Sequence, residues 1–112
     1  MDALDVSLTR GTLDLLILKA LSWGPRHGYG VGEWLESATG STMVIGEGTL
    51  YPALHRLEDQ GLIASFWGTS ENNRKAKYYR ITPEGKRHLV QKRSRWESLV
   101  QAVTRVLGPA TE

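Results

Sequence analysis

No cysteine occurs anywhere in the 112-residue sequence. This absence excludes a disulfide scaffold, a thiolate zinc site, an iron–sulfur cluster and a cysteine nucleophile. Long apolar runs are also missing, because Asp14 and Lys19 interrupt the densest one, Leu13 to Leu21, and a bilayer span needs ~20 residues. The first seven residues hold two aspartates and no basic residue, unlike a secretory signal. We therefore expect a cytoplasmic protein that does not enter a membrane.

Motifs of catalysis and metal binding are absent as well. The sequence contains neither Gly-x-Ser-x-Gly nor His-Glu-x-x-His. Its three histidines, His27, His55 and His88, are far apart in the sequence, so a site for a first-row metal is not expected. Glycines 28, 30 and 32 lack the preceding strand and the following Gly-Lys-Ser/Thr of a phosphate-binding loop, and they indicate close helix packing instead. We predict neither an enzyme nor a bound cofactor.

The charges are distributed unevenly along a chain whose length suits a single domain. Residues 60–95 carry nine basic and two acidic side chains, whereas residues 1–59 carry four basic and eight acidic ones. A regional basic block is what a polyanionic partner requires, although a basic face exposed only to solvent is the simpler alternative. The location of the block in the fold decides between them.

Apolar periodicity predicts helices in the first half of the chain. Residues 13, 16, 17, 20 and 21 share one helical face, with Thr9 or Thr12 as the N-cap and Gly24-Pro25 as the stop. Leu15 and Leu18 lie on the opposite side of this helix, which suggests that a second subunit packs there. Another helix follows, with apolar residues at 31, 34, 35 and 38, and ends at Thr39-Gly40.

A third helix is predicted from about Gly48 to Gln60, with leucines at 50, 54 and 57 on one face. If Thr49 is its N-cap, Pro52 falls in the first turn, where its missing N–H costs little. The opposite, exposed side then carries three polar side chains that could meet a ligand: Tyr51, His55 and Arg56.

The second half of the chain changes character. Residues 62–67 and 76–81 are rich in β-branched and aromatic residues and flank a polar loop, which predicts a β-hairpin. Thr82-Pro83-Glu84 then begins a long helix that reaches Leu107. Apolar residues recur along this helix at heptad spacing, with little of the domain left to cover them, and indicate a dimer interface: Leu89, Trp96, Leu99, Val103 and Val106.

These elements predict a mainly α-helical protein with a small β-hairpin. Residues 1–82 would form a winged helix-turn-helix DNA-binding domain and residues 83–112 a C-terminal dimerisation helix, the two making one structural unit. In such a fold the third helix enters the major groove of double-stranded DNA and the hairpin tip contacts the backbone or the minor groove. The basic block falls on the hairpin and the start of the last helix, where a surface that faces phosphates is expected.

Several stretches of the sequence resemble one family, and they cover residues 8–89 almost continuously. The most specific is the run from Gly48 to Glu58, Gly-Thr-Leu-Tyr-Pro-Ala-Leu-His-Arg-Leu-Glu, followed by Gly61-Leu62-Ile63. Leu13-Asp14-Leu15-Leu16-Ile17-Leu18, His27-Gly28-Tyr29, Lys77-Tyr78-Tyr79-Arg80-Ile81-Thr82 and Gly85 add to it. Together they resemble the PadR family of bacterial transcriptional regulators. The resemblance implies a homodimeric winged-helix repressor whose dimer is built on the first and last helices.

The expected contacts with DNA follow from these positions. Thr49 and Tyr51 are expected to hydrogen-bond phosphates, which sets the register without reading sequence. Either His55 or Arg56 is expected to reach a base edge, with Arg56 to guanine the commonest contact of this kind. Further contacts are expected from the hairpin and from the residue ahead of the first helix: Asn73, Arg74, Lys75, Lys77 and Arg10. Of Tyr78 and Tyr79, at least one is expected to pack on the core.

Two questions stay open at the level of sequence. Trp96 lies centrally on the expected dimer seam, where two indoles could line a site for a small, flat hydrophobic effector. Plain interface packing is the alternative, and it is the commoner role of such an aromatic residue. The domain as a whole could instead bind a protein or RNA partner without operator specificity. A two-fold dimer on an inverted repeat, with half-sites about 10 bp apart or a multiple, is the mechanism we expect.

Overall fold

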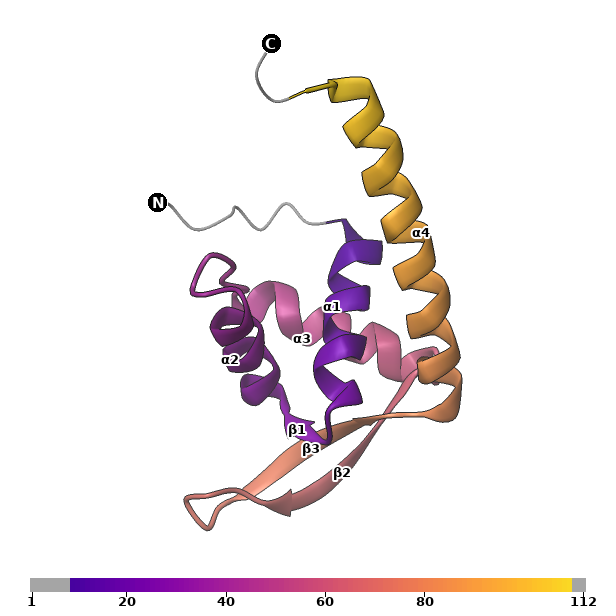
Figure 1. Ribbon diagram of the computed structural model, residues 1–112. Coiled ribbons are helices and arrows are strands. Elements are labelled where there is room, and N and C mark those ends of the chain that lie inside the picture. The colour runs from indigo at the N-terminus through magenta and orange to yellow at the C-terminus, as the bar shows by residue number, and fades with distance from the viewer. Residues whose placement is uncertain (1–8, 110–112) are drawn as a thin grey trace.

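The computed structural model describes residues 9–109. In chain order the elements are α1 (Arg10–Ser22), β1 (Arg26–His27), α2 (Gly28–Ala38), α3 (Glu47–Asp59), β2 (Ile63–Thr69), β3 (Lys75–Ile81) and α4 (Pro83–Leu107). Figure 1 shows α1, α2 and α3 gathered on one side of the sheet, while the β2–β3 hairpin and α4 extend away from them in opposite directions. The mainly helical fold with a small β-hairpin is confirmed.

Three helices begin at side-chain caps. The hydroxyl of Thr9 accepts a hydrogen bond from the backbone N–H of Thr12 at 3.3 Å and so caps α1. Thr82 caps α4 in the same way, accepting from the N–H of Gly85 at 3.0 Å, with Pro83 next to it as predicted. The cap of α2 is His27, whose ring Nδ1 accepts from the N–H of Gly30 at 2.9 Å. Each cap satisfies a backbone donor that the helix itself leaves without a partner.

The start of α3 differs from the prediction. The helix begins at Glu47 with Gly46 as its N-cap, and none of the described side chains caps it. Thr49, expected as the cap, lies in the first turn, where its N–H bonds the carbonyl of Gly46 at 3.0 Å. Pro52 consequently lies one turn inside the helix and has no N–H to donate to the carbonyl of Gly48. Gly48 and Pro52 are both exposed, so a water molecule can donate the missing hydrogen bond to the carbonyl of Gly48.

The sheet has one strand more than the predicted hairpin. Its order is β1-β3-β2, all antiparallel, and His27 of β1 lies opposite Tyr78 of β3. A strand of two residues has no periodicity to find in a sequence. The turn between β2 and β3 places Asn73 at φ 57°, a left-handed conformation that asparagine tolerates. We call β2, β3 and the connecting residues 70–74 the wing.

The hydrophobic core lies between α1, α2, α3 and the sheet, with α1 at its centre. Leu18 of α1 is 0% exposed, so the expectation that it packs against a second subunit is wrong. That side of α1 is apolar because the rest of its own chain covers it. Tyr79 is buried in the same core, which confirms that one of the two hairpin tyrosines packs there. Tyr78 stacks on Phe66 on the other face of the sheet, with 5.6 Å between the ring centroids.

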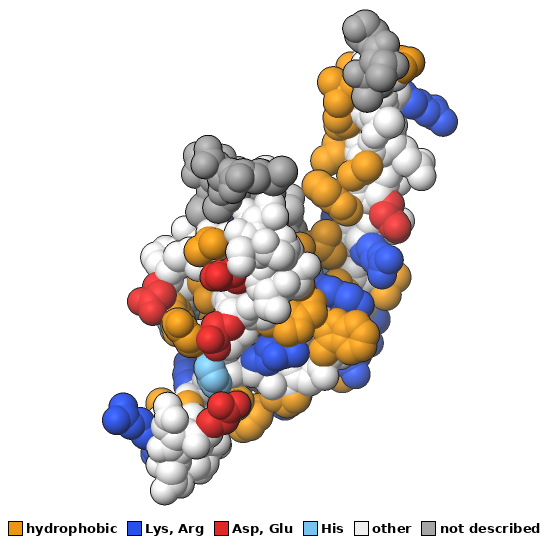
Figure 2. All heavy atoms as spheres, turned by 60° about the vertical axis from the view of Figure 1, so that its left-hand side comes forward, with side chains coloured by type: hydrophobic (Ala, Val, Ile, Leu, Met, Phe, Trp, Pro, Cys, Tyr) orange, Lys and Arg blue, Asp and Glu red, His pale blue; other side chains and the backbone are white. Residues whose placement is uncertain are grey.

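The first turn of α4 is pressed against the beginning of β2. A Cβ atom on Gly85 would lie 2.0 Å from the carbonyl oxygen of Leu62, so only glycine fits there. Leu89, one turn further on, packs partly against the core of its own chain, so only part of its side chain is left for the expected dimer interface. The helix then passes alongside α1, and its later turns expose an apolar surface, visible in Figure 2 along the upper arm of the molecule. We call this surface the α4 stripe; it comprises Trp96, Leu99, Val100, Val103, Val106 and Leu107.

Candidate nucleic-acid interface

A groove of about 490 Å³ lies between the N-terminal half of α3 and the return strand of the wing. Tyr51 and His55 enter it from α3, Tyr29 from α2, Lys77 from β3 and Asn72 from the turn. Tyr51 and His55, which were expected to contact DNA from the third helix, therefore lie across the groove from Lys77, which was expected to contact DNA from the hairpin. The groove joins the two elements that a winged helix presents to nucleic acid.

Tyr51 is held in this groove by close packing on α2. A Cβ on Gly28 would lie 2.6 Å from Cε1 of the Tyr51 ring, so the glycine makes room for it. The sequence predicts an exposed Tyr51, but in the structure its side chain is half-buried. Burial, together with the negative charge of Glu47, raises the pKa of the Tyr51 hydroxyl above its usual value. The hydroxyl is therefore a hydrogen-bond donor at neutral pH, as a contact with phosphate requires.

Arg56 does not lie on the exposed face where the helical wheel places it. Its Nη2 lies 2.6 Å from Oδ1 of Asp14 on α1, and the two side chains are 23% and 8% exposed. To reach a base edge, the Arg56 side chain would have to break this charged hydrogen bond with Asp14. His55, one residue earlier, is exposed on the groove side of α3.

The far end of α3 is tied to the wing by Glu58. Its carboxylate accepts a hydrogen bond from the hydroxyl of Ser65 on β2, and Oε1 lies 3.6 Å from Nζ of Lys77 on β3. Lys77 is thus already paired within the chain. These contacts fix the distance between helix and wing, and no pattern in the sequence predicts either of them.

The remaining predicted contact residues fall in two places. Asn73, Arg74 and Lys75 are exposed at the tip of the wing, which Figure 1 shows as the part of the sheet farthest from the helices. Arg10 is the first residue of α1, at the end of that helix away from the wing. Of the predicted wing contacts, the structure thus brings only Lys77 to α3, and it places the residues of the tip and Arg10 apart from that helix.

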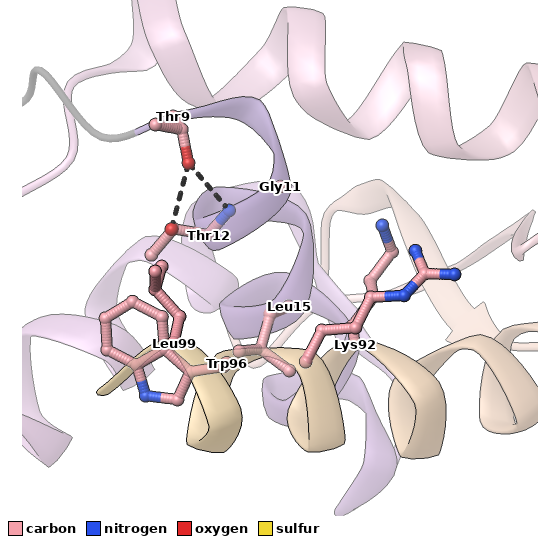
Figure 3. Close-up of a pocket in the computed structure, with 8 residues that line it drawn as sticks. Thr9, Gly11, Thr12, Leu15, Lys92, Trp96 and Leu99 are labelled. Atoms are coloured by element: carbon pink, nitrogen blue, oxygen red, sulfur yellow. Dashed lines mark hydrogen bonds between the residues drawn. The ribbon is translucent and has the colours of Figure 1, made fainter. Parts of the chain in front are cut away.

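A second, smaller pocket of about 220 Å³ lies between α1 and α4. Figure 3 shows Leu15 of α1 close to Trp96 and Leu99 of α4, with the hydroxyl groups of Thr9 and Thr12 hydrogen-bonded at 2.9 Å beside them. Lys92 and Arg95 also line the pocket. Of the residues expected at a dimer interface, Leu15, Trp96 and Leu99 meet here.

Neither a metal site nor a membrane span emerges from residues 9–109. No group of three histidine or carboxylate side chains within this range could hold a metal ion. None of the helices described there is long and apolar enough to cross a bilayer.

Three helices followed by a β-hairpin wing, with a polar helix face and a basic tip beside one groove, define a winged helix-turn-helix protein. More particularly, the chain belongs to the PadR-like family of transcriptional regulators, whose family model matches residues 17–91. This is a family of regulators and not of enzymes.

Two individual relatives are similar to the chain over most of its length. The chain is 32% identical over 96 residues to an uncharacterised protein of Lysinibacillus sphaericus, covering 86% of this chain and 88% of that one. It is 37% identical over 78 residues to the transcriptional regulator Rv3488 of Mycobacterium tuberculosis, covering 70% of this chain and 59% of the other.

Solved structures give the same result. A transcriptional regulator from Clostridium thermocellum superposes with a TM-score of 0.81 at 37% identity, over 88% of this chain and 96% of that one. A PadR family regulator from Eggerthella lenta superposes with a TM-score of 0.75 at 38% identity, over 92% and 86% of the two chains. The winged helix-turn-helix fold is thereby confirmed.

Proposed function

We propose that the protein is a cytoplasmic, homodimeric repressor that binds a specific inverted repeat in double-stranded DNA. The observation that carries this proposal is the groove in which Tyr51 and His55 of α3 face the basic wing. Helix and wing would straddle one strand of the duplex, so that α3 lies in the major groove and the tip of the wing lies over the adjacent backbone.

Within this complex the side chains have different roles. Thr49 and the protonated hydroxyl of Tyr51 donate hydrogen bonds to phosphates and set the register of α3. His55 is the residue that reads a base, because Arg56 is bound to Asp14. Asn73, Arg74 and Lys75 hold the backbone from the wing, and Lys77 does so only after leaving Glu58. Arg10 reaches only DNA that extends beyond the half-site.

Two subunits would associate through the C-terminal segment 83–112, which contains α4, and through Leu15 of α1. The α4 stripe is the surface that a second copy covers, with Trp96, Leu99, Val103 and Val106 as its main contacts. A two-fold axis through this interface presents two α3 helices to successive major grooves, about 10 bp apart or a multiple of that spacing. Occupation of such an operator blocks transcription.

The pocket between α1 and α4 supports a second role, the binding of a small, flat hydrophobic effector against Trp96. Its apolar wall is formed by Leu15, Trp96 and Leu99, and a second subunit would close its open side. Lys92 and Arg95 at its edge favour a ligand with a negative charge over one with a positive charge. A ligand that binds one dimer arrangement better than the other shifts the distance between the two α3 helices and relieves repression.

The proposal is tested by selecting duplexes from a random pool with the purified protein and titrating the winner against a scrambled duplex at two salt concentrations. We expect an enriched inverted repeat, preferred by at least about a thousandfold. His55→Ala should relax the preference at one base pair of each half-site. Lys75→Ala should weaken both duplexes alike and lower the salt slope by about one unit per subunit.

The alternative is a winged helix that binds RNA or a protein. Equal affinity for all duplexes, or no binding to any of them, would favour that alternative and leave the fold unchanged.

A further inference from the structure

Trp67, near the end of β2, is unusually exposed for an indole side chain, with 64% of its surface accessible. The strand register shows which way it faces. Trp67 lies opposite Lys77, and Ser65, two residues earlier, lies opposite Tyr79. Because cross-strand partners share a face, these four side chains lie on one side of the sheet.

That side of the sheet is the one that faces α3. Tyr79 is buried in the core there, and the hydroxyl of Ser65 donates to Glu58 of α3. Trp67 therefore lies on the wing on the same side as α3, directly across the strands from Lys77, which lines the groove. The sequence-based set of contact residues, all polar or charged, did not include it.

A cation accompanies this indole. The ammonium group of Lys75 lies 5.2 Å from the centre of the Trp67 ring, within the range of a cation–π interaction. Gly68, Thr69 and Asn73 complete a shallow hollow beside the pair, of about 390 Å³. The result is a flat apolar surface with a positive charge at its edge and hydrogen-bonding groups next to it.

We propose that Trp67 and Lys75 together bind one sugar–phosphate unit of the duplex beside the half-site that α3 contacts. The indole packs against the apolar face of a deoxyribose, and the ammonium group donates to the adjoining phosphate. This inference rests on the proposed function. The charges beside Trp67 favour the polyanion over a second copy of the chain, since Lys75 lies over its ring and Lys77 is its cross-strand partner.

The chain provides a matched control in Trp23, which caps the C-terminal end of α1. Trp23 is 68% exposed, and the ammonium group of Lys19 lies 5.0 Å from the centre of its ring. The two tryptophans thus have the same exposure and the same kind of cationic partner. Only Trp67 lies on the wing, on the side of α3.

The test measures the affinity of each variant for the selected operator and for a scrambled duplex. Trp67→Ala should weaken the affinity for both duplexes by about tenfold, because the variant can no longer bury part of an indole ring against the DNA. It should leave the salt slope unchanged because no charge is removed, whereas Lys75→Ala should lower it. Trp67→Phe should retain most of the affinity, and Trp23→Ala should bind like the unmodified protein.

Fluorescence provides an independent readout. The emission of Trp67 is obtained as the difference between the unmodified protein and Trp67→Phe, and we expect the duplex to quench or shift it. The emission of Trp23, obtained in the same way, should stay constant.

Unchanged affinity of Trp67→Ala, together with unchanged Trp67 emission in the presence of a bound duplex, would overturn the inference while leaving the proposed function intact. A change in oligomeric state in place of a change in DNA affinity would also overturn it, because Trp67 would then contact a second copy. If the unmodified protein bound no duplex at all, the proposed function would fail first and this inference with it.

Discussion

Asp14 is the only charged residue that is buried among those the structure describes. A buried carboxylate is costly unless a partner satisfies it, and Arg56, 42 positions further along the chain, does so. The pair joins α1, at the centre of the core, to α3, the helix proposed to enter DNA. Arg56 thus ties α3 to α1 from the side of the core, and in the proposed complex this leaves the reading of bases to His55.

The two partners should differ in their effect on stability. Arg56→Ala leaves an uncompensated carboxylate in the core and should lower the free energy of unfolding by about 3–5 kcal/mol. Asp14→Ala leaves a guanidinium group that can turn to solvent, and it should cost about 1–3 kcal/mol. Urea unfolding followed by circular dichroism measures both values.

The paired replacement of Asp14 by Leu and Arg56 by Met is the control for that experiment. It removes both charges at once and should be less damaging than Arg56→Ala alone. If Asp14→Ala proved the more damaging of the two single variants, Asp14 would not depend on Arg56 for its burial.

For single residues, the sequence predicts which side of α3 is polar better than it predicts the partners of the polar side chains. The helical wheel of α3 separates its leucines from its polar side chains correctly, and it places Arg56 among the latter. The wheel contains no information about Asp14, which lies on another helix. The one available signal was Asp14 itself, a carboxylate within an apolar run whose burial requires a cationic partner somewhere in the chain.

At the scale of elements, the close contact between α4 and Leu62, the residue just before β2, depends on Gly85. Gly85→Ala places a methyl group against the carbonyl of Leu62 and should lower the free energy of unfolding by at least about 2 kcal/mol. Gly11→Ala is the matched control, because nothing lies within 4 Å of its Cβ position and alanine favours the helix. Thermal unfolding of both variants checks this, and equal melting temperatures would contradict it.

The first turn of α4 also predicts a dependence on pH. A hydrogen bond from Arg87 lowers the pKa of Glu84, and His88 lies 3.3 Å from the same carboxylate. A carboxyl whose pKa is lower in the folded state contributes stability above its unfolded pKa and loses it as the pH falls through the folded pKa. Glu84→Gln should therefore melt at a lower temperature than the unmodified protein at pH 7. The difference should vanish at the acidic end of a pH series, and a constant difference would contradict this origin.

Elements with strong boundary signals were predicted accurately, and those without them were not. Thr82-Pro83-Glu84 defines the start of α4, and the predicted range matches the observed Pro83–Leu107. The start of α3 was misplaced because Thr49 has the composition of a cap, whereas the actual cap, Gly46, offers only its backbone. β1 could not be predicted from the sequence, because two residues form no pattern of their own and they pair with β3 only in the folded chain.

At the scale of the whole molecule, the α4 stripe determines the proposed assembly. Val103→Asp introduces a charge into this surface and should weaken the dimer by at least about tenfold. Ser98→Asp adds the same charge to the same helix outside the stripe, and it should leave the association constant unchanged. Sedimentation equilibrium of the two variants gives both constants. Equal weakening would indicate an effect of net charge, and no weakening in either would place the interface elsewhere.

The contact at Gly85 gives α4 the mechanics of a lever. The helix is held by this contact near one end and by α1 along its next turns, and its residues after Gly85 extend for roughly 33 Å. A tilt of about 10° about this contact displaces the far end by about 6 Å over such a length. The wing lies beside the fulcrum and moves far less. Large displacements at the far end of α4 would therefore produce only small displacements of the surface that we propose to contact DNA.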